Sequence, residues 1–129
     1  MPAIRDLQHL LANLDARRVP GRFVFVAAPP ERLAALPALA TIREDEGWTV
    51  VLRAEDADAA ALRYDFVAAW ITLTVHSDLA AVGLTAAVSR ALAEAGIAGN
   101  VLAGLHHDHL LVPEARADDA LAAIRALRG

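Results

Sequence analysis

The sequence predicts an α+β protein built from two tandem ferredoxin-like (βαββαβ) units with antiparallel sheets. Residues 22–63 and 70–128 both show the order strand–helix–strand–strand–helix, which is an internal repeat of pattern, although a weak one by residue identity. The chain of 129 residues is long enough for two very small units that share a core. We place the units at 1–65, which includes a leading helix, and at 66–129.

The first half is expected to open with an amphipathic helix. Its apolar side chains recur at helical spacing (Ile4, Leu7, Leu10, Leu11 and Leu14), Arg17 and Arg18 suit its C-terminal end, and Pro20-Gly21 ends it. Residues 22–28 then form a buried strand, and 29–37 form a brief helix between prolines. The segments 39–44 and 48–53 flank Asp45-Glu46-Gly47 as a hairpin, and 54–63 read as a helix.

The second half repeats this plan with stronger signals. In residues 70–76, Ile71, Leu73 and Val75 fall on one face of a strand, and Thr72, Thr74 and His76 fall on the other. A helix over 84–96 ends at Gly96, the segments 99–106 and 109–113 form a second hairpin, and 114–129 form the last helix. Residues 66–69 could complete the first unit. The second unit must borrow a fourth strand from the first half or stay incomplete.

Composition limits the classes of function. Apolar residues make up 57% of the chain and the net charge is only −4, which suggests more hydrophobic surface than a monomer needs, so we expect a homodimer. The absence of Cys excludes disulfides and thiolate chemistry. Twelve scattered basic residues, all Arg, argue against a nucleic-acid partner. We see no signal peptide, membrane span or glycine-rich phosphate loop, and expect a cytoplasmic protein without membrane contact or cofactor.

Residues 71–104, ITLTVHSDLAAVGLTAAVSRALAEAGIAGNVLAG, carry a family pattern. A strand ends in a polar loop with a glycine, a helix starts at once, and AGIAGNV leads into the next strand. This segment resembles the ACT domain, a small ligand-sensing module attached to many amino-acid enzymes. With GRFVFV and HDHLLVP included, nearly the whole chain is similar to a group of small, largely uncharacterised stand-alone bacterial proteins that have two ACT-like halves.

The resemblance implies a binding site. In ACT domains that bind amino acids, the loop after the first strand and the start of the next helix hold the ligand, and an Asn from a neighbouring domain commonly helps. The matching positions are Asp78, Val82, Gly83, Leu84 and Asn100. Val82 stands where the family usually has Pro, and the first half has no comparable glycine loop, so we expect only the second half's loop to bind.

The segment LHHDHLLV at 105–112 raises a separate hypothesis. The predicted topology brings His76 close to His109, with His106, Asp108 and Asp78 at the same edge. Imidazole and carboxylate groups can bind zinc or nickel, but we assign no metal, because His107-Asp108 also suits a two-residue turn that would leave His106 and His109 as a cross-strand pair.

Three functions therefore remain open. The first is a non-catalytic regulatory protein that binds a small molecule, possibly an amino acid, and a polar pocket at residues 78–84 and Asn100 would support it. The second is an oligomerisation or interaction module without a ligand, which a Gly83 packed shut against the first half would favour. The third is a metal enzyme or sensor that uses His76, His106, Asp108 and His109, and side chains that point away from each other would exclude it.

Overall fold

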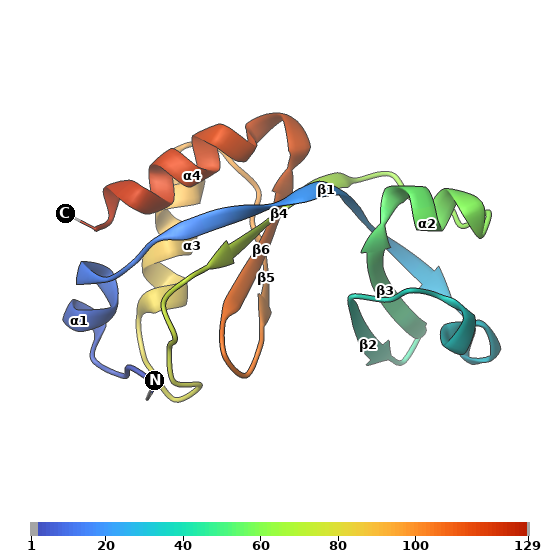
Figure 1. The fold of residues 1–129 in the computed structure, drawn as a ribbon, viewed down its shortest axis with the longest axis horizontal. Coiled ribbons are helices and arrows are strands. Elements are labelled where there is room, and N and C mark those ends of the chain that lie inside the picture. The colour runs from blue at the N-terminus through green and yellow to red at the C-terminus, as the bar shows by residue number, and fades with distance from the viewer. Residues whose placement is uncertain (1–2, 129) are drawn as a thin grey trace. The chain divides into compact units, whose positions relative to one another are not determined.

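A computed structural model describes residues 3–128 as a series of short helices and strands (Figure 1). The strands are β1 (Ala16–Ala28), β2 (Ala40–Glu44), β3 (Gly47–Arg53), β4 (Val67–Leu73), β5 (Asn100–Ala103) and β6 (Asp108–Pro113). The α-helices are α1 (Leu7–Ala12), α2 (Ala54–Ala59), α3 (Leu84–Glu94) and α4 (Ala117–Ala126), and two 3-10 helices lie at η1 (Pro30–Ala35) and η2 (Glu114–Arg116). None of the helices within residues 3–128 combines the length and apolar character needed to cross a membrane.

The strand order is β2-β3-β1-β4-β6-β5, and β1 and β4 serve both compact units. One unit, here called the discontinuous unit, joins the described part of residues 1–20 to that of 69–129; the other, the continuous unit, is 21–68. Each unit has the four-stranded order of a βαββαβ fold, which confirms the predicted fold class. The predicted division at residue 65 differs from these units, because the leading segment packs with residues 69–128.

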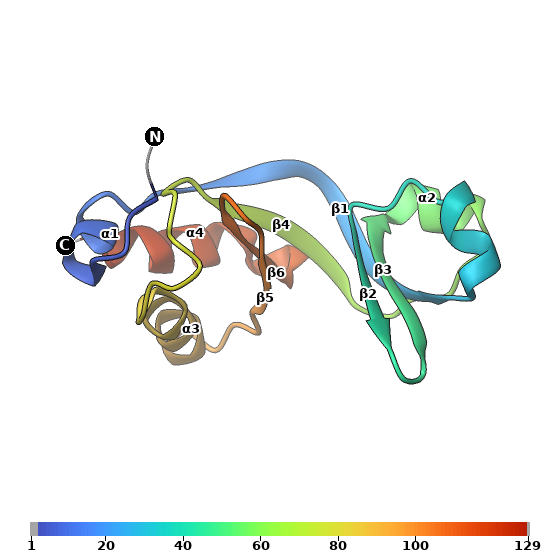
Figure 2. The same cartoon turned by 90° about the horizontal axis from the view of Figure 1, so that it is seen from below.

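In the discontinuous unit, the first part of β1 supplies the fourth strand that the second half lacks. Thr74 N donates to Asp15 O at 2.9 Å, just where β4 ends and β1 begins. Helices α3 and α4 cover the same face of the sheet (Figure 2). Its core includes Ile71 and Leu73 of β4 and Val75 just after this strand, as predicted. Buried Val88 of α3 and Ile124 of α4 belong to the same core. Of the two alternatives left open for the second unit, the structure has the borrowed strand.

The continuous unit has its own smaller core. Strands β1 and β3 pair antiparallel from Phe23↔Arg53 to Ala28↔Trp48, and β2 pairs with β3 up to Glu44↔Gly47, so the predicted hairpin is confirmed. Val24, Val26 and Ala28 on β1 face the same core as Val50 and Leu52 on β3. Leu33 and Leu36 of the η1 region pack against this core, which closes the unit on one face of its sheet.

The predicted leading helix is too long. Asp6 caps α1 by accepting the His9 N–H at 2.9 Å, but the helix ends at Ala12, and residues 16–20, which include Arg17 and Arg18, are strand. Pro20-Gly21 therefore lies within β1 rather than at a helix end. Pairing of β1 with β3 starts only at Phe23, so Pro20 interrupts no bond of that ladder. Residues 16–20 are strand because they pair beside β4, and this tertiary contact outweighs the local tendency toward helix.

Candidate functional site

Three segments of the discontinuous unit meet at one end of it. They are the start of the described chain, the segment after β4, and the loop of the β5–β6 hairpin, and both views place them side by side (Figures 1 and 2). Ile4 N donates to His76 O and Asp78 N donates to Ile4 O, each at 2.8 Å, as a single parallel bridge between Ile4 and Ser77. The backbone of residues 4 and 76–78 is thereby fixed next to the hairpin loop.

A depression of about 600 Å³ opens between these segments and α1. We call it the histidine pocket, and its lining residues are Ile4, His9, Asn13, Thr74, Val75, His76, His106 and His107. Imidazole, amide and hydroxyl groups surround two aliphatic side chains, of which Val75 is buried. The pocket thus combines an apolar floor with several groups that can donate hydrogen bonds.

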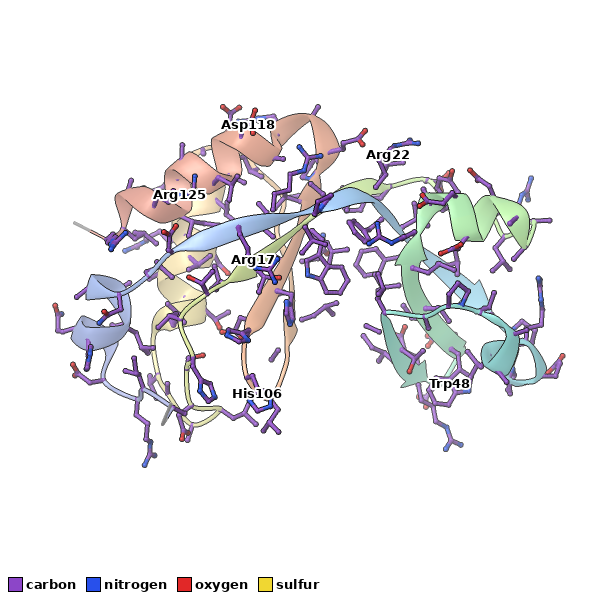
Figure 3. The ribbon with its side chains drawn as sticks, in the orientation of Figure 1. Arg17, Arg22, Trp48, His106, Asp118 and Arg125 are labelled. Atoms are coloured by element: carbon purple, nitrogen blue, oxygen red, sulfur yellow. The ribbon has the colours of Figure 1, made fainter. Side chains whose placement is uncertain are left out.

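Two imidazole rings lie near that of His76. The ring centroid of His76 lies 5.4 Å from that of His106 and 6.0 Å from that of His107. His106 stands at the tip of the β5–β6 hairpin (Figure 3). The loop is tightened by a hydrogen bond from Gly104 N to His107 O at 2.9 Å, which presents both rings toward the end of β4.

The His109 ring contacts Trp70 and Thr72 of β4, and the predicted closeness of His76 and His109 stays a prediction. In the β5–β6 register, His109 stands opposite Leu102 and Asp108 stands opposite Ala103, and the connecting loop spans 104–107. The prediction of a two-residue turn at His107-Asp108, with His106 and His109 as a cross-strand pair, therefore fails. A Cβ at Gly104 would lie 2.8 Å from His107 O, so the glycine allows the loop to close tightly.

Side chains of strand β4 hold the His109 ring. His109 Nδ1 lies 3.0 Å from Thr72 Oγ1 and accepts from Trp70 Nε1 at 3.3 Å, and the Trp70 and His109 ring centroids are 5.3 Å apart. Burial lowers the pKa of His109 below its ordinary value, and the nearby charges of His107 and Arg17 act in the same direction, whereas Asp108 opposes them. The ring therefore favours its neutral form.

The residues of the hypothetical metal site, His76, His106, Asp108 and His109, do not come together as ligands of one ion. Asp108 Oδ2 lies 3.4 Å from Ser77 Oγ, and His109 is held by Trp70 and Thr72. Among residues 3–128 there is no group of three or more His, Asp or Glu side chains placed to hold a metal ion. The four candidates therefore do not form one ligand set in this part of the chain.

The loop predicted by the family resemblance runs from Asp78 to Leu84. Asp78 Oδ1 accepts from Ala80 N at 2.7 Å and lies 3.8 Å from Arg5 Nε, while Val82 is 81% exposed. Gly83 precedes α3 with φ +105°, a conformation that favours glycine, and no side chain caps the helix there. Leu84 is buried and anchors the first turn of α3 in the core.

The side chain of Leu7 covers one side of Gly83. A Cβ atom at this position would lie 2.9 Å from Leu7 Cδ2 of α1. The glycine thus allows α1 to approach the loop closely, in addition to providing its positive φ. This is the close packing against the first half of the chain that favours the function without a ligand.

Asn100 lies far from Gly83 within the unit. It opens β5, after α3 has run its 11 residues from the loop, which is a distance of roughly 16 Å at the usual rise per residue. Its Nδ2 donates to Leu111 O across the hairpin at 3.3 Å, and the residue is exposed. The structure does not bring Asn100 together with the Asp78–Leu84 loop inside one unit.

Four polar residues of the histidine pocket were not among the predicted site residues. His9 and Asn13 stand four apart on and just after α1, and the other two are Thr74 and His107. A polar pair at helical spacing on an otherwise apolar helix was the available signal. It gave no information on which strand end the helix would face.

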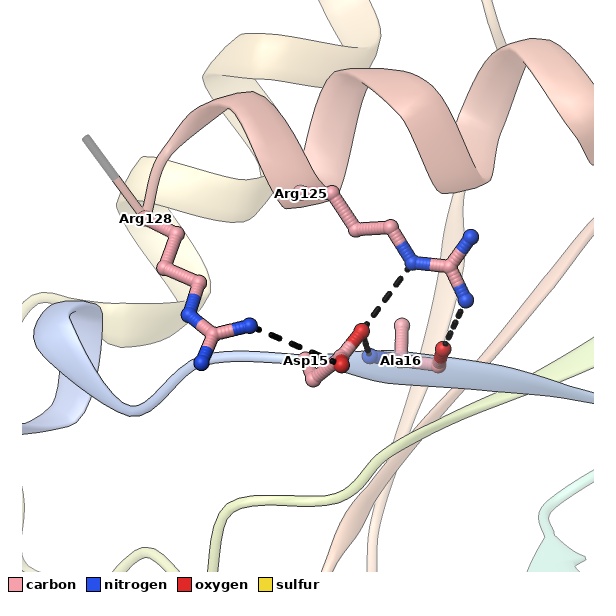
Figure 4. A network of polar contacts seen from close by, with 4 residues as sticks. All are labelled: Asp15, Ala16, Arg125 and Arg128. Carbon is pink, nitrogen blue, oxygen red and sulfur yellow. Dashed lines mark hydrogen bonds and ion pairs between the residues drawn. The ribbon is translucent and has the colours of Figure 1, made fainter.

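A second polar cluster ties the start of β1 to α4 (Figure 4). Arg125 Nε donates to Asp15 Oδ1 at 3.0 Å, and its Nη2 donates to Ala16 O at 2.7 Å. Arg128 Nη1 lies 3.7 Å from Asp15 Oδ2. The backbone N–H of Ala16 and the Arg125 guanidinium hold the pKa of Asp15 below its ordinary value.

Comparison with solved structures shows both a close relative and wider fold relatives. A Vibrio cholerae protein of unknown function, described as a possible transport protein, is 42% identical with a TM-score of 0.87, over 95% of this chain and 96% of that one. The regulatory subunit of aspartate kinase from Thermus flavus is 12% identical, with a TM-score of 0.61 over 91% and 97% of the two chains.

A third similar structure is a larger enzyme. The aspartate kinase of Clostridium acetobutylicum is 9% identical with a TM-score of 0.66, and the match covers 90% of this chain but 34% of the enzyme. At such low identity the kinases show a shared fold only. No curated protein matches the sequence.

Family models give the remaining comparison. Two ACT domain models match, one over residues 2–69 and the other over 66–127. Domains of this family are typically regulatory and generally bind small ligands. Because these matches span nearly the full length and agree with the observed strand order, the chain belongs to the ACT domain family.

Proposed function

We propose that this protein is a non-catalytic regulatory protein that binds an amino acid through the Asp78–Leu84 loop and works as a cytoplasmic homodimer. The observation that carries the proposal is the uncapped start of α3 directly after this loop. Backbone N–H groups at a helix N-terminus attract carboxylates, and Gly83 places no side chain over them. The ACT family membership supports the same role.

Asn100 gives the reason for a dimer in this proposal. It is exposed and separated from Gly83 by the length of α3, so the two residues can share one ligand only if Asn100 comes from a second copy. An amide side chain offers both a donor and an acceptor to the amino and carboxylate groups of a ligand. Two such sites would then form per symmetric dimer.

The test is thermal unfolding of the whole chain with each of the twenty amino acids in turn. A ligand at about 100 times its Kd adds about 2.7 kcal/mol, enough to raise Tm by several degrees. Asn100→Ala and Asp78→Asn should remove the shift, and the second change keeps an oxygen that can accept from Ala80 N. Ser89→Ala, at an exposed position of α3, serves as the control and should leave the shift unchanged.

Substitutions of Gly83 are unsuitable for this test, because any Cβ there meets Leu7 and strains the backbone. A shift that persists in Asn100→Ala and Asp78→Asn would contradict the proposed site. No shift with any amino acid would contradict the proposed ligand class.

A second candidate function is an interaction module without a ligand, and the packing of Leu7 over Gly83 favours it. Leu79, Val82 and Leu105 are 65%, 81% and 69% exposed, which is unusual for large apolar side chains in the discontinuous unit. Replacing all three by Ser should reduce self-association in sedimentation equilibrium if this surface pairs copies. If self-association is unchanged and an amino acid still raises Tm, the regulatory function is the one of the two candidates that remains.

A further inference from the structure

The chemistry of the histidine pocket is not used by the proposed ACT-type site. We propose that this pocket binds a small organic acid, with the carboxylate held by the imidazoles of His76, His106 and His107 and the apolar part of the molecule resting on Ile4 and Val75. This goes beyond the proposed function, because none of Asp78, Val82, Gly83, Leu84 or Asn100 lines the pocket.

The chemistry of the lining favours an acid over a base. Among the described residues that line the pocket there is no Asp or Glu, and the carboxylates next to them in sequence make hydrogen bonds of their own. Asp6 accepts from His9 N at 2.9 Å, Asp78 from Ala80 N at 2.7 Å, and Asp108 lies 3.4 Å from Ser77 Oγ. A carboxylate that enters the pocket would meet imidazole, amide and hydroxyl donors.

The imidazoles lie close enough together to reach one bound molecule. The His76 ring centroid lies 5.4 Å from that of His106 and 6.0 Å from that of His107, and all three residues line the same pocket. An imidazole N–H donates to a carboxylate oxygen at about 2.8 Å, so neighbouring rings can share the two oxygens of one carboxylate. Hydrogen bonds fix the backbone of both segments, Ile4 N to His76 O at 2.8 Å and Gly104 N to His107 O at 2.9 Å.

The volume and the floor indicate an organic molecule rather than an inorganic anion. At about 600 Å³ the pocket is of the size that holds small organic ligands, and far larger than phosphate or chloride needs. Ile4 is half-buried and Val75 is 6% exposed, so the floor offers fixed aliphatic contacts beside the polar wall. Asn13 and Thr74 add further donors at the rim.

The test measures binding to the full-length protein by NMR, following the imidazole C–H resonances during titration with benzoate and butyrate. Benzamide is the neutral counterpart, and inorganic phosphate and Zn²⁺ are titrated separately. We expect both acids to shift the resonances of His76, His106 and His107, with benzamide at least tenfold weaker because charge-assisted hydrogen bonds are lost. Neither phosphate nor Zn²⁺ should match the acids.

Variants locate the site. His106→Glu places a carboxylate at the exposed hairpin tip, where folding tolerates it, and should weaken benzoate binding at least tenfold, whereas His106→Gln should weaken it less. His109→Gln, on the same hairpin but held by Trp70 and Thr72, is the matched control and should bind as the parent does.

The proposal is overturned if benzamide or phosphate binds as tightly as the acids do. It is also overturned if the His106→Glu variant binds benzoate as tightly as the parent, or if neither acid shifts the histidine resonances. Asn100→Ala separates it from the amino-acid site: it should leave benzoate binding intact even where it removes an amino-acid response. Loss of both responses in Asn100→Ala would mean that the pocket is not an independent site.

Discussion

The side chain of Leu7 occupies the space next to Gly83 that any larger residue would need: a Cβ on Gly83 would stand 2.9 Å from Leu7 Cδ2. One contact thus joins α1 to the start of α3 at the loop expected to bind a ligand. Exposure of that loop and the docking of α1 are therefore physically linked. This contact leads to two predictions, one on stability and one on binding.

Gly83→Ala should lower the free energy of unfolding by about 1–3 kcal/mol, because it combines a positive φ with a contact on Leu7. Urea denaturation of the two proteins measures the loss. Gly96→Ala is the control, since it has φ +72° but open space around its Cβ, and should cost about 1 kcal/mol from the backbone alone. Equal losses of stability at both positions would show that the Leu7 side chain moves aside without lowering the free energy of unfolding.

Leu7→Ala should strengthen binding at the Asp78–Leu84 loop while it lowers the Tm of the free protein. Removing the isobutyl group uncovers the Gly83 backbone and takes apolar contacts from α1. The measurement is the Tm increase caused by the amino acid that stabilises the parent, compared between parent and variant. Leu11→Ala, a half-buried change one turn later on the same helix, is the control. A smaller ligand shift in Leu7→Ala than in Leu11→Ala would contradict this link.

His109 should make the protein less stable on acidification. Its pKa in the folded state is lowered from 6.5, so the unfolded chain binds the proton more readily. The stability contributed by the neutral ring is complete above pH 6.5 and is lost as the pH falls through the lower, folded-state value. His109→Gln should flatten the dependence of Tm on pH between about 7 and 5. Ser89→Ala, an exposed change that removes no titratable group, should leave it unchanged.

Arg125→Ala should lower Tm more than Arg128→Ala does, although both arginines reach Asp15. Arg125 makes two hydrogen bonds, to Asp15 Oδ1 at 3.0 Å and to Ala16 O at 2.7 Å, whereas Arg128 only approaches at 3.7 Å. Because the folded-state pKa of Asp15 is lowered, this stabilisation is present above pH 3.8 and is lost as the pH falls through the folded value. The gap between the two variants should therefore close in acid, as thermal melts at neutral pH and near pH 2 can establish.

Local patterns were sufficient for most of the elements. The alternation of Ile71, Leu73 and Val75 with polar residues predicted the buried face of β4, and Gly47 and Gly96 marked a hairpin and a helix end correctly. Such signals depend only on neighbours in the chain, since side-chain period and turn conformation are local properties. The repeated element order and the ACT resemblance followed from them.

Contacts between residues far apart in the sequence determined the other features of the fold and of the candidate site. The sequence alone determined the fold class, the repeat, the loop residues 78–84 and Asn100 as candidates, and the abundance of histidine near the second hairpin. Only the tertiary structure decided that residues 16–20 pair beside β4, that Leu7 covers Gly83, and that His76 meets His106 and His107 while His109 turns to Trp70. Which face of a helix docks, and which register a hairpin takes, depends on the packing of segments far apart in the chain, and local periodicity carries no information about that.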